Sequence, residues 1–131
     1  MDYECTALVT LLSLLFYWVV MFNVGRARGK YGVKAPAISG DPAFDRVFRV
    51  HQNTMEALVL QLPSLWLFAI YVSDCWAAGL GLVWILGRII YARAYYADAG
   101  KRGTGMLILT LANAVLFLGA LISLGLGIYR S

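Results

Sequence analysis

Residues 46–56 read RVFRVHQNTME, and residues 57–63 continue as ALVLQLP with no turn residue between the two runs. We interpret both as one continuous helix with a charged half and a membrane-type half. At about 100° per residue, four polar side chains share a stripe about 80° wide: Arg46, Arg49, Asn53 and Glu56. His51 points to nearly the opposite side. Ionisable groups that enter a bilayer are costly, so they usually line a water-filled cavity or a subunit interface.

The composition of the whole chain is that of a membrane protein. Of the 131 residues, 61% are hydrophobic and 14% are charged, and the mean hydropathy is +0.73. A soluble domain is about half apolar and about a quarter charged. The net charge of +4 sits in clusters between apolar runs, which indicates membrane topology and predicts no nucleic-acid partner.

Four apolar runs are long enough to cross a bilayer, at about 5–24, 42–72, 76–96 and 106–129. A hydrocarbon core about 30 Å thick needs about 20 apolar residues in a helix. Acidic residues precede the first run and basic residues follow it, whereas a cleaved signal peptide begins with basic residues. We therefore expect this run to remain in the protein as a membrane helix. The chain is thus predicted to be a single all-α membrane domain, a four-helix bundle over residues 1–131.

The connections between these runs predict the topology. Glycine and proline residues interrupt any helix between 25 and 43, and a second loop is expected at 98–105. Asp41 is expected to cap the second helix, with Pro42 at its first position, and Pro63 predicts a kink. Basic residues in both loops place them on the cytoplasmic side, with both termini on the opposite side.

Two cysteines, Cys5 and Cys75, match no zinc or redox motif. Both are expected on the non-cytoplasmic side, so a disulfide is open to them where that side is oxidising. The simpler interpretation is two inert thiols, and the sequence does not decide between them.

Polar residues from four separate segments should meet at the cytoplasmic end: Arg28, the stripe Arg49–Glu56, the shared face Arg88, Tyr91 and Tyr95, and Arg102. This set suits a small ligand with several carboxylates and one ammonium group, because arginines clamp carboxylates in bidentate pairs and a carboxylate holds the ammonium. We find no hydrolase triad, phosphate loop or metal-ligand pair, and predict no metal. The expected class is a membrane site for a charged small molecule, next to an apolar ligand from the bilayer.

Three motifs carry a resemblance to a known family. They are ARGKY at 27–31, RVHQNTME at 49–56, and GLGLVWILGR at 79–88 continuing to Tyr95-Tyr96 and Lys101-Arg102. With them the chain resembles, over nearly its whole length, the membrane-associated proteins in eicosanoid and glutathione metabolism (MAPEG). The HQNT version of the second motif is most similar to the third microsomal glutathione transferase subgroup of that family.

The resemblance implies a homotrimer that binds glutathione between neighbouring protomers. One protomer would contribute Arg49, Asn53, Glu56, Tyr91 and Tyr95. Its neighbour would contribute Arg28 and His51, while Arg88 supports the site and Arg102 activates the sulfur. The implied function is a detoxifying transferase that conjugates glutathione to apolar electrophiles in the membrane, with reduction of lipid hydroperoxides as a related peroxidase activity.

Other interpretations remain open at this stage. The family member specialised for leukotriene synthesis has an amide where His51 stands and an arginine where Gly29 stands, which disfavours that activity here. A non-catalytic lipid-binding or scaffold member of the family is the alternative function. The basic residues would then be topology determinants or snorkelling anchors, and the tyrosines an aromatic belt. A transporter is disfavoured because the charges gather at one face.

Overall fold

The computed structural model describes residues 2–131 as four long α-helices and one short 3-10 helix. Their bounds are α1 Glu4–Tyr31, α2 Pro42–Tyr71, α3 Asp74–Ala97, η1 Ala99–Lys101 and α4 Gly103–Arg130. The four α-helices contain 28, 30, 24 and 28 residues, and each is long and apolar enough to cross a membrane. The predicted all-α, four-span architecture is confirmed.

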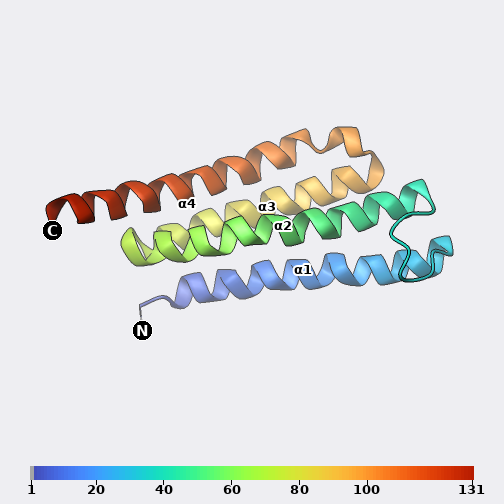
Figure 1. The fold of residues 1–131 in the computed structure, drawn as a ribbon, viewed down its shortest axis with the longest axis horizontal. Helices are drawn as coiled ribbons and strands as arrows, with labels where there is room; N and C mark the ends of the chain where they lie inside the picture. Colours follow the sequence, from blue (N-terminus) through green and yellow to red (C-terminus); the bar gives the residue numbers. More distant parts are fainter. Residues whose placement is uncertain (1) are drawn as a thin grey trace.

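The helices run alternately up and down (Figure 1). α2 and α3 form the middle of the bundle, and α1 and α4 lie on opposite sides of this pair. Both termini lie at one end, and the α1–α2 and α3–α4 connections lie at the other. The bundle therefore has two distinct ends, as the topology requires; which end faces the cytoplasm stays a prediction.

α1 is seven residues longer at its C-terminus than predicted, and the expected loop from 25 to 43 is wrong over its first part. A glycine inside a helix costs about 1 kcal/mol relative to alanine, which packing can offset. Val24 and Ala27 provide that packing, because they are buried in one apolar cluster with Phe44 of α2. The helix ends where Gly32 adopts a left-handed conformation, with φ of 69°.

The starts of α2 and α3 follow from side-chain caps. Asp41 Oδ1 accepts hydrogen bonds from the backbone nitrogens of Ala43 and Phe44, at 2.8 and 3.4 Å, which confirms the predicted start of α2. Ser73 caps α3, which begins at Asp74, two residues before the expected position. α4 begins at Gly103, three residues before its expected start, because η1 compacts the connection that precedes it.

α3 and α4 cross in close contact at two glycines. A Cβ atom on Gly105 would overlap the backbone of Tyr91, and one on Gly87 would lie 2.8 Å from the Leu109 backbone nitrogen. Small residues allow helices to approach closely in membranes, where van der Waals packing drives association. This crossing holds the start of α4, and with it Arg102, next to Tyr91.

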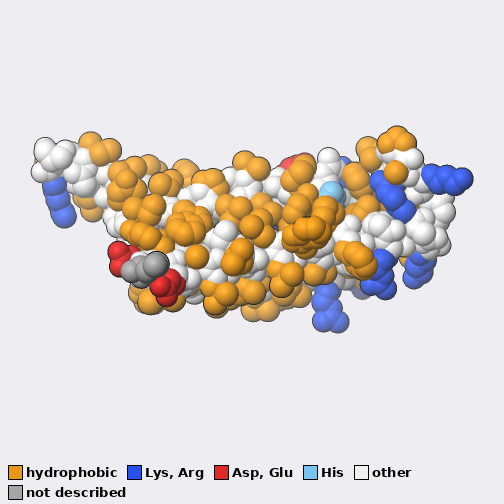
Figure 2. All heavy atoms as spheres, turned by 90° about the horizontal axis from the view of Figure 1, so that it is seen from below, with side chains coloured by type: hydrophobic (Ala, Val, Ile, Leu, Met, Phe, Trp, Pro, Cys, Tyr) orange, Lys and Arg blue, Asp and Glu red, His pale blue; other side chains and the backbone are white. Residues whose placement is uncertain are grey.

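The surface also distinguishes the two ends of the bundle (Figure 2). Lysines and arginines gather toward the end that carries the interhelical connections, whereas the sides are covered by apolar side chains. Large exposed side chains such as Leu11, Trp18 and Phe22 belong to this apolar belt. An exposed apolar surface of this extent indicates contact with lipid or with further protein.

Candidate functional site

A cavity of about 660 Å³ opens between α2, α3 and α4. Its polar part is lined by Asn53, Glu56, Arg88, Tyr91 and Arg102. Its apolar part is lined by Ala57, Leu60, Met106, Leu109, Ala114 and Phe117, with Thr110 and Asn113 among them. The volume is in the range of small-molecule sites, which is about 300–1,000 Å³. We call this cavity the α2–α4 pocket.

Asn53 and Tyr91 meet at the wall of the pocket. Asn53 Nδ2 donates a 2.7 Å hydrogen bond to the Tyr91 hydroxyl oxygen, which joins α2 to α3. Tyr91 is only 2% exposed, so its phenol has little freedom to turn away. Because the oxygen already accepts from Asn53, the hydroxyl proton remains available to donate to an acceptor in the pocket.

Arg88 is a buried cation beside the same wall. Its side chain is 2% exposed, its Nε donates to Thr54 Oγ1 at 3.2 Å, and its guanidinium lies 4.4 Å from the centre of the Tyr91 ring. Its Nη2 atom finds no hydrogen-bond partner among residues 2–131. A buried charged group without full pairing is costly. An anion bound in the pocket would therefore be stabilised by Arg88.

Arg102 lies at the mouth of the pocket, immediately before α4. Its Nη1 donates a 2.7 Å hydrogen bond to the Ala99 carbonyl, and its guanidinium lies 5.9 Å from the centre of the Tyr95 ring. Within the described chain, no side chain caps the first turn of α4. The free N–H groups of a helix start carry a partial positive charge. Arg102 and the start of α4 thus both favour a negatively charged group here.

Arg49 and Tyr95 are outside the lining of the pocket, and each is one helical turn from a lining residue. Arg49 is exposed on α2, one helical turn before Asn53. Tyr95 is buried, with its ring centre 5.5 Å from that of Tyr91. Both positions extend the polar part of the pocket toward the end of the bundle that carries the connections.

Arg28 and His51 are not among the residues that line the α2–α4 pocket. Arg28 Nη1 donates to the Ala37 carbonyl at 2.7 Å, so this side chain holds the α1–α2 connection. His51 stacks on Tyr17 of α1 with 5.3 Å between ring centres, and its Nε2 lies 3.2 Å from the Tyr17 hydroxyl oxygen. His51 therefore lies on the side of α2 that faces α1, and Arg28 belongs to α1 itself. A site shared between protomers requires such an arrangement, but the sharing itself stays a prediction.

Sequence reasoning missed two polar residues of the site. Thr54 accepts from Arg88, which lies 34 residues away, and no local pattern predicts that pair. Asn113 lines the pocket on α4, is 7% exposed, and has a side-chain oxygen without a hydrogen-bond partner in the described part of the chain. The sequence did carry a signal for Asn113, because it is the one amide side chain in the otherwise apolar run 111–122.

A second, smaller cavity continues the apolar side. It has a volume of about 240 Å³, lies between α2 and α4, and shares Leu60 and Phe117 with the α2–α4 pocket. Its other lining residues are almost all apolar, among them Val59, Pro63 and Leu67. The two cavities together form a path from a cationic end into the apolar middle of the bundle.

Four membrane spans and a cationic pocket continued by an apolar groove define a small integral membrane protein with a site for an anionic ligand. The chain matches the MAPEG family model over residues 6–122 and belongs to that family. The family resemblance inferred from the motifs is therefore confirmed.

Several relatives cover most of the chain. An uncharacterized protein of Synechocystis is 52% identical over 90% of this chain and 86% of its own length. Microsomal glutathione S-transferase 2 of Homo sapiens is 40% identical over 88% of this chain and 79% of its own. Leukotriene C4 synthase of Cavia porcellus is 36% identical over 92% and 79%. The human and guinea-pig relatives, by their names, support glutathione-related transferase activity in general, and the third-subgroup assignment stays a prediction.

Proposed function

We propose that the protein is a membrane-bound glutathione transferase with its active site in the α2–α4 pocket. The observation that carries this is one cavity lined at one end by Arg88, Tyr91 and Arg102 and at the other by apolar side chains of α4. A charged thiol and an apolar acceptor can therefore meet within it. We place this end of the bundle on the cytoplasmic side.

The charged end of the pocket offers complementary groups for glutathione. Its carboxylates would pair with Arg88 and, at the mouth, Arg49, because guanidinium groups bind carboxylates in a planar, bidentate manner. Glu56 would hold the ammonium group. In a homotrimer, Arg28 and His51 of the neighbouring protomer would close the site from the side that lies open in the single protomer.

Arg102 is proposed to stabilise the thiolate. A free thiol has a pKa of about 8.5, so only a few per cent is ionised at neutral pH. Lowering that pKa by about two requires a preference for the anion of about 2.7 kcal/mol. A cation about 4 Å from the sulfur, at an effective dielectric constant near 20, offers about 4 kcal/mol. One arginine at the start of α4 is therefore sufficient in magnitude.

The chemical step is nucleophilic attack by the thiolate on an apolar acceptor. The sulfur lone pair forms a C–S bond to the electrophilic carbon, and the leaving group departs with its bonding electrons. The acceptor enters from the bilayer along the groove past Leu60 and Phe117. With a lipid hydroperoxide, the thiolate would instead attack the terminal oxygen and break the O–O bond, and a second glutathione would complete the reduction.

Conjugation of glutathione to a chlorinated nitrobenzene tests this function. The purified protein should catalyse it, and Arg102→Leu should lose about a hundredfold in rate at neutral pH while still binding glutathione by calorimetry. Arg93→Leu, which removes an exposed arginine of α3 outside the pocket lining, is the matched control. If neither wild type nor variant conjugates or forms the ultraviolet-absorbing thiolate, the scaffold alternative is correct.

Sharing of the site between protomers has its own test. Arg28→Ala and Arg102→Leu should each be strongly impaired at neutral pH as pure trimers. Co-expression should produce mixed trimers in which some sites combine a wild-type Arg102 with a neighbour's wild-type Arg28, and activity should return in part. Absence of any recovery, with mixed trimers verified by differential tags, would show that each site is built from one protomer.

A further inference from the structure

The start of α1 is capped by a residue of α3. In the described chain, Tyr3 at the N-cap position of α1 makes no side-chain capping bond. Asp74 Oδ1 takes that role, accepting from the Thr6 backbone nitrogen at 2.9 Å and from Thr6 Oγ1 at 2.7 Å. Thr6 is fully buried. The first turns of α1 and α3 are therefore held in one fixed register.

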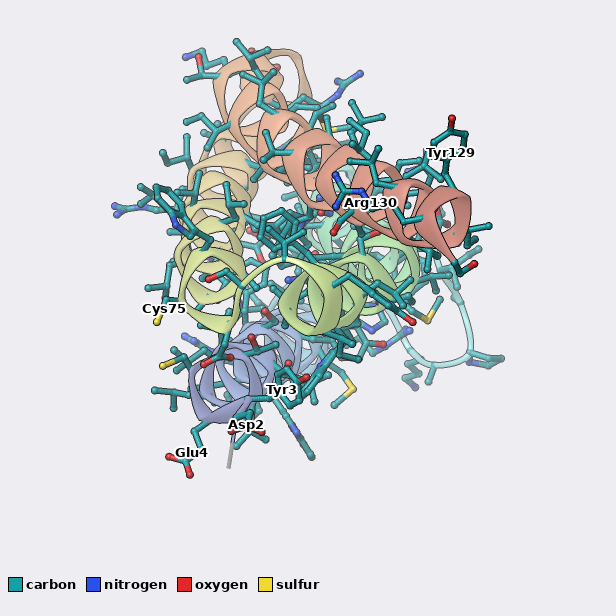
Figure 3. The ribbon with its side chains drawn as sticks, turned by 90° about the vertical axis from the view of Figure 1, so that its left-hand side faces the viewer. Asp2, Tyr3, Glu4, Cys75, Tyr129 and Arg130 are labelled. Atoms are coloured by element: carbon teal, nitrogen blue, oxygen red, sulfur yellow. The ribbon has the colours of Figure 1, made fainter. Side chains whose placement is uncertain are left out.

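This register brings the two cysteines together. Cys5 precedes Thr6, and Cys75 follows Asp74. The two sulfur atoms and a carboxylate oxygen of Asp74 all lie within 4.8 Å of one another, and both thiols are free and exposed. In Figure 3, which looks along the bundle from this end, Cys75 projects outward from the beginning of α3. The pair sits at the starts of α1 and α3, and these lie at the opposite end of the bundle from the start of α4, which Arg102 precedes (Figure 1).

The chemistry of the group favours a disulfide over a metal ion. A structural zinc site is completed by four ligands, and this cluster offers three groups, of which the Asp74 carboxylate already accepts two hydrogen bonds from Thr6. A disulfide needs only the two sulfur atoms, which lie within 4.8 Å of each other and would have to approach to about 2.05 Å. The neighbouring Thr6–Asp74 bonds prevent the backbones from separating.

We propose that Cys5 and Cys75 form a redox-active dithiol that closes to an intramolecular disulfide by exchange with a low-molecular-weight disulfide. One cysteine thiolate attacks a sulfur of that disulfide, such as glutathione disulfide, and one thiol leaves as its thiolate. The second cysteine then attacks the mixed disulfide at the protein sulfur and displaces the second thiol. Two protein thiols are oxidised and one external disulfide is reduced to two thiols, which take up the two protons that the cysteines lose.

The cross-link has a physical consequence at this end of the molecule. It closes a loop that contains α1 and α2, and long closed loops restrict the unfolded chain most. The oxidised protein should therefore unfold at a higher temperature than the reduced protein. Conjugation in the α2–α4 pocket should not change, because the bond adds no group to that pocket and the register it fixes is already held by Thr6 and Asp74.

The test uses the full-length protein in detergent at low concentration, equilibrated with mixtures of glutathione and glutathione disulfide and quenched with acid. Intact mass should fall by that of two hydrogens, and a linked peptide should contain Cys5 and Cys75. Cys5→Ser and Cys75→Ser should stop at one glutathione adduct each. The Asp74→Ala variant should need a several-fold higher concentration of glutathione disulfide before half of its cysteine pairs are oxidised. The substitution removes the hydrogen bonds that hold the start of α1 against α3.

Two outcomes would overturn the assignment. One is a wild-type protein that accumulates glutathione on both cysteines without closing the internal bond. The other is a wild-type protein that forms only disulfides between chains. Conjugation activity, measured on the same samples, is independent of either outcome, so failure here does not affect the transferase proposal.

Discussion

The amide of Asn53 and the hydroxyl of Tyr91 are joined by a 2.7 Å hydrogen bond across the α2–α3 interface, at the wall of the pocket. This bond determines where the Tyr91 hydroxyl points. Replacing Asn53 with Leu removes the donor and keeps the side-chain volume. Since a neutral hydrogen bond contributes about 0.5–1.5 kcal/mol, kcat/KM for glutathione should fall about 2- to 13-fold.

Tyr91→Phe should lower kcat/KM for glutathione at least as much as Asn53→Leu, because it also removes the hydroxyl proton that can be donated to the ligand. Tyr129→Phe is the control, since that tyrosine is 88% exposed at the far end of α4. Steady-state kinetics with varied glutathione measures all three variants. Equal kinetics for Tyr91→Phe and wild type would show that the hydroxyl does not contact the substrate.

The pH dependence of conjugation should depend on Arg102. The guanidinium stabilises the thiolate, so it lowers the pKa of the bound thiol below its free value of about 8.5. Arg102→Leu should raise that pKa, and the rate should then increase with pH through the higher value and approach wild type in alkaline solution. Lys101→Leu, at the neighbouring exposed position, should leave the profile unchanged. A profile for Arg102→Leu that parallels wild type would contradict thiolate stabilisation.

The glycine crossing of α3 and α4 should not tolerate a methyl group. In Gly105→Ala the new Cβ would meet the backbone of Tyr91, which cannot rotate away as a side chain can. Overpacking of this kind typically costs about 1–3 kcal/mol. We expect a lower unfolding temperature and reduced activity, since α4 must shift and carry Arg102 with it. Gly103→Ala, whose Cβ would meet no described atom within 4 Å, should be near wild type in both measurements.

Thr54 should be required for the position of Arg88. Thr54→Val keeps the shape of the side chain but leaves Arg88 Nε without its acceptor, and an unpaired buried donor costs about 1–3 kcal/mol. We expect a lower unfolding temperature and weaker glutathione binding by calorimetry. Thr54→Ser restores the hydroxyl and should recover both. If Thr54→Val and Thr54→Ser have the same unfolding temperature and glutathione affinity, the Thr54 hydroxyl is not what holds Arg88 in position.

The errors in the predicted boundaries have a physical cause. Glycines at 25 and 29 predicted the end of the first helix, but burial of Val24 and Ala27 against Phe44 keeps that segment helical to Tyr31. The helix-propensity cost of about 1 kcal/mol per glycine is smaller than the stabilising free energy that packing within the bundle contributes. By contrast, the start of α2 was predicted correctly, because a cap is a contact between residues two and three apart.

The sequence by itself determined that the chain is a four-span membrane protein, where its charge lies, and which polar residues share a helix face. These properties depend on composition and on periodicity within a helix. Only the tertiary structure decided that Thr54 supports Arg88, that Gly105 seats α4 against Tyr91, and that Asp74 caps α1 beside two thiols. Each of these contacts joins residues far apart in the chain, and their distances depend on how the helices cross.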